Sequence, residues 1–82
     1  MNTMLRLKNI ARNNDYISAN YYPEDSEIAG FVSVDINSGD IFDSDTTSYD
    51  GYLNAYLSHA ARALSEMSKS DSLPSERLVM WY

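Results

Sequence analysis

The chain has 82 residues, a formal net charge of −6 and no cysteine. These values predict one small acidic domain and exclude disulfides and thiolate metal sites. Only six residues are Lys or Arg, and none of them lies between positions 13 and 61, which disfavours a protein that binds duplex nucleic acid through its phosphates. The N-terminal residues contain no long apolar run, so we expect neither a signal peptide nor a transmembrane helix, and a cytoplasmic protein.

Residues 4–11 fit two structures. Apolar and basic side chains alternate between positions 5 and 8, as in a strand, whereas Met4, Leu7 and Ala11 would share one face of a helix. We predict a strand, because the polar residues that follow are typical of a turn.

The next three predicted elements are strands, at residues 15–22, 28–36 and 40–44. Pro23 begins an acidic loop between the first two, since proline cannot donate to a strand ladder. Asn37-Ser38-Gly39 separates the last two and predicts a hairpin turn in which Gly39 has a positive φ.

The acidic residues around this turn also resemble a calcium-binding loop. The glycine is fifth rather than sixth in the run that starts at Asp35, and Thr46 stands where a bidentate Glu is needed. A hairpin is therefore the interpretation we prefer. With a hairpin there, we expect at most weak, adventitious binding of divalent ions by Asp40, Asp43 and Asp45.

Residues 49–69 predict the one helix. Apolar residues recur there at steps of three and four, which places them on one side of a helix. The predicted stripe consists of Tyr49, Leu53, Tyr56, Ala60, Leu64 and Met67, with Tyr52, Leu57 and Ala63 beside it. Thr47 to Asp50 match a capping box that would start the helix, with Thr47 as the N-cap and Asp50 as the alternative.

The chain ends in a loop around Pro74 and a last predicted strand, residues 77–82, that is apolar on both faces. The order is thus β-β-β-β-α-β in a single domain, residues 1–82. It indicates an α+β fold in which an antiparallel meander of four to five strands packs on one long amphipathic helix. The last strand would lie antiparallel beside the first if the first is a strand; otherwise a parallel crossover is expected.

One helix covers only one face of such a sheet. Alternation along the strands places one set of residues under the helix: Ile17, Ala19, Tyr21, Val32, Val34, Ile36, Leu78 and Met80. The opposite face would carry large aromatic and apolar residues: Tyr16, Tyr22, Phe31, Val79 and Trp81, together with Phe42. An apolar patch of this kind usually marks an interaction site.

We therefore expect a non-enzymatic interaction or accessory protein that forms a homodimer, or binds another protein, through the helix-free face or the last strand. The alternative is a binder of a small ligand or of single-stranded nucleic acid on the same aromatic face. His59 is the only histidine, and we interpret it as structural, because no neighbouring motif supplies a catalytic partner. We expect no metal and no cofactor.

Overall fold

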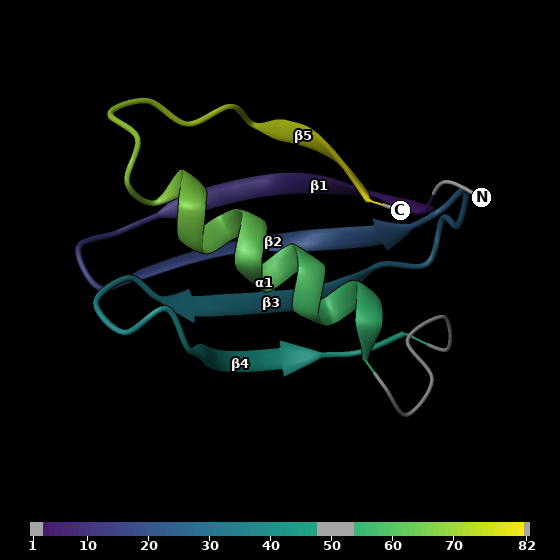
Figure 1. Ribbon diagram of the computed structural model, residues 1–82, viewed down its shortest axis with the longest axis horizontal. Helices are drawn as coiled ribbons and strands as arrows, with labels where there is room; N and C mark the ends of the chain where they lie inside the picture. Colours follow the sequence, from purple (N-terminus) through teal and green to yellow (C-terminus); the bar gives the residue numbers. More distant parts are fainter. Residues whose placement is uncertain (1–2, 48–53, 82) are drawn as a thin grey trace.

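The structure is a computed structural model that describes residues 3–47 and 54–81, with backbone alone for Thr3 and Trp81. Five strands form one antiparallel sheet, and a single described helix crosses one of its faces (Figure 1). In chain order the elements are β1 (Thr3–Arg12), β2 (Tyr16–Pro23), β3 (Gly30–Asp35), β4 (Ile41–Asp45), α1 (Ala55–Met67) and β5 (Glu76–Trp81). The predicted fold class and element order are confirmed.

The strand prediction for residues 4–11 is also confirmed. β1 pairs with β2 on one side and with β5 on the other, antiparallel in both cases, so the last strand lies beside the first. Leu5 and Leu7 are fully buried, because their side chains share the face that meets the helix. A bulge interrupts the β1–β2 pairing at Asn9, whose φ is 57°. The sheet order is β4-β3-β2-β1-β5, which leaves β4 and β5 as its edges.

The helix was predicted over residues 49–69, and its first part, with Tyr49, Tyr52 and Leu53, lies outside the described residues. The described helix begins at Ala55, after Asn54 with a left-handed φ of 52°, and ends at Met67. The predicted capping box lies largely outside the described residues. The described buried stripe consists of Leu57, Ala60, Ala61, Leu64 and Met67. Ala60, Leu64 and Met67 were predicted there, whereas Leu57 replaces Tyr56 at its centre, and Tyr56 is only half-buried.

The core lies between this stripe and the inner face of the sheet. Alternation along β2 and β3 was predicted correctly: the sheet contributes Leu5, Leu7, Ile17, Ala19, Tyr21, Val32 and Val34 to the core. Ile36 packs against its margin. The opposite face of β2 and β3 carries polar and aromatic residues, so burial of the inner face determines the register of these strands.

The predicted orientation of the last strand is wrong. Val79 packs against the core, while Leu78 and Met80 are 53% and 52% exposed. Val79 pairs with Leu5 and Leu78 pairs with Arg6, and residues paired across a ladder share a face. A strand that is apolar on both sides contains no pattern that selects one face. The neighbouring strand β1 therefore decides it.

The hairpin between β3 and β4 is confirmed. Gly39 has a φ of 79°, and its N–H donates to the Asp35 carbonyl at 2.8 Å. The Asp35 carboxylate accepts from the backbone N–H groups of Asn37 and Ser38 at 2.8 and 3.2 Å. Asp35 thus shapes the turn with its side chain, as aspartate commonly does.

Candidate functional site

The helix-free face of the sheet is the candidate site. Register places the following described residues on this open face: Arg6 and Lys8 of β1, Tyr16, Ser18, Asn20 and Tyr22 of β2, Phe31, Ser33 and Asp35 of β3, Asp43 and Asp45 of β4, and Glu76, Leu78 and Met80 of β5. Basic and apolar side chains lie on the β1–β5 half, and carboxylates gather on the β3–β4 half. Of the acids named here, Asp35, Asp43 and Asp45 lie on one side of the open face, and Glu76 lies on the other side beside Lys8.

Two cations flank one aromatic ring on the basic half. The Arg6 guanidinium carbon lies 5.4 Å from the centroid of the Tyr22 ring, and the Lys8 amine lies 5.3 Å from it. Both distances are within the range of a cation–π contact. Arg6 also donates to the Ser26 carbonyl at 2.9 Å, and the Lys8 amine lies 3.7 Å from the Glu76 carboxylate. These contacts hold the two cations in place beside β5.

A second aromatic contact lies at the acidic half. The rings of Tyr16 and Phe42 stack with their centroids 4.3 Å apart. Ile41 pairs with Val34 and Asp43 pairs with Ser33, so Phe42 is the extra residue of a bulge in β4. The bulge lets Phe42 reach the Tyr16 ring, although Phe42 stays 62% exposed.

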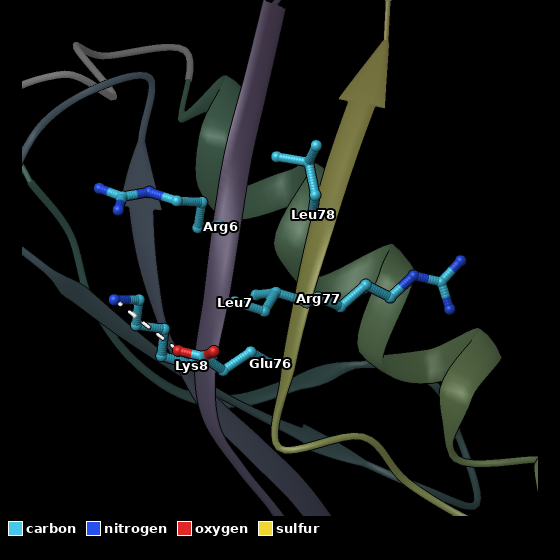
Figure 2. A pocket seen from close by; sticks show the side chains of 6 residues that line it. All are labelled: Arg6, Leu7, Lys8, Glu76, Arg77 and Leu78. Carbon is cyan, nitrogen blue, oxygen red and sulfur yellow. Dashed lines mark ion pairs between the residues drawn. The ribbon is translucent and has the colours of Figure 1, made fainter.

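A hollow of about 450 Å³ lies beside β1 and β5. Its lining consists of Arg6, Leu7, Lys8, Glu76, Arg77 and Leu78. Figure 2 shows the ion pair between Lys8 and Glu76 across the two strands, with Arg77 extending away from it. A second hollow of about 340 Å³ lies between α1 and β5, where His59 is one of the lining residues. β5 is thus incompletely covered on both faces.

The six residues predicted for this site have different outcomes. Tyr16, Tyr22 and Phe31 lie on the open face as expected, and Phe42 joins them by stacking on Tyr16. Val79 was assigned to this face and instead packs toward the helix, because it pairs with Leu5. The side chain of Trp81 is outside the described part of the structure; its backbone pairs with Thr3.

Sequence reasoning missed four residues of the basic half: Arg6, Lys8, Leu78 and Met80. The alternation of basic and apolar residues in β1 was visible in the sequence. What it could not show is that β5 pairs with β1 in a register that places Leu78 opposite Arg6. Only this pairing brings exposed apolar carbon next to the two cations.

Comparison of the chain with protein-family models, with curated proteins and with solved structures found no match. Within residues 3–47 and 54–81, no helix has the length and apolarity needed to cross a membrane. Over the same ranges, no three His, Cys, Asp or Glu residues gather closely enough to hold a metal ion.

Proposed function

We propose that this chain is a protein-interaction module without catalytic activity that forms a homodimer through the β5 side of its open sheet face. The observation that carries this proposal is the exposure of Leu78 and Met80, each about half in water. Both lie on an edge strand: Leu78 lines the hollow that Arg6 and Lys8 also line, and Met80 lines the hollow between α1 and β5. A chain without cysteine suits the reducing cytoplasm, where we place the module.

The physical reason lies in how this surface is composed. An isolated exposed leucine needs no explanation, but Leu78 and Met80 are neighbours on one face of the same strand and border a concavity. Apolar groups in such a place favour contact with another protein surface. The two cations at the margin, Arg6 and Lys8, supply polar contacts that orient a partner.

A ligand that stacks on the aromatic residues is supported less well. The Tyr22 ring is already in contact with Arg6 and Lys8, and Asp35, Asp43 and Asp45 lie on the same face, where they would repel phosphates. Titration with a short single-stranded oligonucleotide tests this alternative. Saturable binding to the wild-type chain at moderate salt would favour it over the dimer.

The dimer is tested by light scattering during size-exclusion chromatography, comparing wild type with Leu78→Glu/Met80→Glu. We expect a dimeric wild type and a monomeric variant of unchanged helix content, because both side chains are half exposed within one chain. Ile28→Glu is the matched control, since Ile28 is 67% exposed but lies in the β2–β3 loop. A wild type that stays monomeric at the highest concentration reached, or a double variant that stays dimeric, would contradict the proposal.

A further inference from the structure

The two edges of the sheet differ in how they resist strand pairing. β4 carries a bulge and the exposed acids Asp43 and Asp45, and both features protect an edge strand from pairing with another chain. β5 has no register shift against β1. Its middle residues, Leu78, Val79 and Met80, carry no charge. One edge is therefore closed to a second strand, while the other is suited to receive one.

Hydrogen bonds show which backbone groups of β5 point away from the sheet. The Ser75 carbonyl accepts from the Ile10 N–H at 3.3 Å, so it points toward β1. The Met4 carbonyl accepts from the Glu24 N–H at 2.9 Å, on the β2 side of β1. The N–H and carbonyl groups of successive residues point to opposite sides of a strand. Both hydrogen bonds therefore imply the same orientation for the backbone groups of β5. Leu78 and Met80 direct their N–H and carbonyl groups outward from β5.

These outward groups are a row of donors and acceptors that another strand can satisfy. Among the described residues, no contact within the chain takes up the backbone groups of Leu78 or Met80 on this edge. The same two residues carry the exposed apolar side chains. Backbone pairing and apolar burial would thus be satisfied by one event, the addition of a strand along β5.

Charge favours pairing of two copies at their β5 edges over packing of their open faces against each other. Each chain carries −6, and pairing at β5 places the acidic β4 edges at opposite ends of the combined sheet. Nine strand spacings of about 4.8 Å separate them by roughly 43 Å, several times the Debye length at physiological salt. In the middle of the open face Tyr16, Tyr22 and Phe31 are only partly exposed, whereas Leu78 and Met80 at the β5 edge are about half exposed.

We infer, on the basis of the homodimer proposed above, that β5 pairs antiparallel with β5 of a second copy to form one continuous ten-stranded sheet. The two-fold axis runs perpendicular to the sheet, so both α1 helices lie on the same face. Strand pairing alone buries less than the roughly 800 Å² per subunit typical of a stable interface. The hollows on either side of β5, about 450 and 340 Å³, receive the side chains of the partner strand and supply the remaining contact.

Because the chain lacks cysteine, single cysteine variants give a direct test. Outward residues pair with outward residues, so the two-fold axis passes between the two copies of one β5 residue, which pairs with itself. Leu78→Cys, Val79→Cys and Met80→Cys are compared under mild oxidation with Ser18→Cys, on the open face, and Ser44→Cys, on β4. We expect one β5 variant to form the covalent dimer about tenfold faster than either control, because only residues at the axis bring their Cα atoms within disulfide range.

The outcomes separate this inference from the proposed function. A dimer that crosslinks fastest through Ser18→Cys is face-to-face, which overturns edge pairing and leaves the homodimer standing. Mixed crosslinking of the Val79→Cys and Ser44→Cys variants, without self-crosslinking at β5, shows head-to-tail pairing and also overturns it. A dimer in light scattering with no β5 crosslink does the same. A chain that is monomeric throughout overturns both proposals.

Discussion

The ring of Tyr21 lies against the Cα of Gly30, its partner across β2 and β3. A Cβ atom at position 30 would overlap this ring, and Tyr21 is fully buried. The glycine is therefore required by close packing and not by its backbone conformation. It lets the largest buried side chain of the core lie flat across β3.

Gly30→Ala should accordingly destabilise the protein by about 1–3 kcal/mol, the usual cost of overpacking a core. Urea unfolding measures this loss. In a Tyr21→Leu background the added methyl has room, so the second substitution should cost much less than it does in wild type. Additive losses in this double-mutant cycle would show that the ring does not limit position 30.

Leu64→Ala tests the orientation of the helix. Leu64 is fully buried between α1 and the sheet, so we expect a loss of about 2–5 kcal/mol, a large share of a small domain's stability. Arg62→Ala is the control, because its side chain is 79% exposed and forms only a surface pair with Glu66 at 3.8 Å. That change should stay within about 0.5 kcal/mol. Equal losses for the two variants would mean that the helix is oriented incorrectly.

Gly39→Val tests the hairpin. Gly39 has a φ of 79°, a conformation that a β-branched residue adopts only with strain, so we expect a loss of about 1–3 kcal/mol. Gly39→Asn should lose less, since asparagine tolerates positive φ better. Thermal unfolding of both variants measures the difference. If valine and asparagine melted alike, backbone strain would not be the cause.

Glu24 is partly buried and links the β2–β3 loop to β1 and α1, so its removal should be costly. One carboxylate oxygen accepts from the Met4 N–H at 3.0 Å and from the Tyr56 hydroxyl at 2.8 Å. Glu24→Ala leaves both donors without this acceptor, and we expect a loss of about 1–3 kcal/mol. Glu24→Gln keeps an acceptor oxygen and should lose less. Glu27→Ala, at an exposed position of the same loop, is the control in chemical denaturation, and a loss equal to that of Glu24→Ala would contradict the linking role.

Local sequence patterns determined most of the elements. Polar and apolar residues alternate through β2 and β3, and the core face of both strands follows from this alternation. Ala60, Leu64 and Met67 recur at helical spacing, and this spacing predicted the buried side of α1. Gly39 marked the turn, because positive φ is a local requirement that glycine meets.

Only the tertiary structure decided the features on which the candidate site depends. β5 is apolar on both faces, so its orientation was set by pairing with β1, which turned Val79 inward and left Leu78 and Met80 in water. The same pairing brought Arg6 and Lys8 beside them and made β5 an edge. The sequence of a strand shows how its side chains alternate between the two faces. The strand that β5 pairs with, however, lies far away in the chain. The choice between its two faces is therefore made by long-range register, which no local pattern contains.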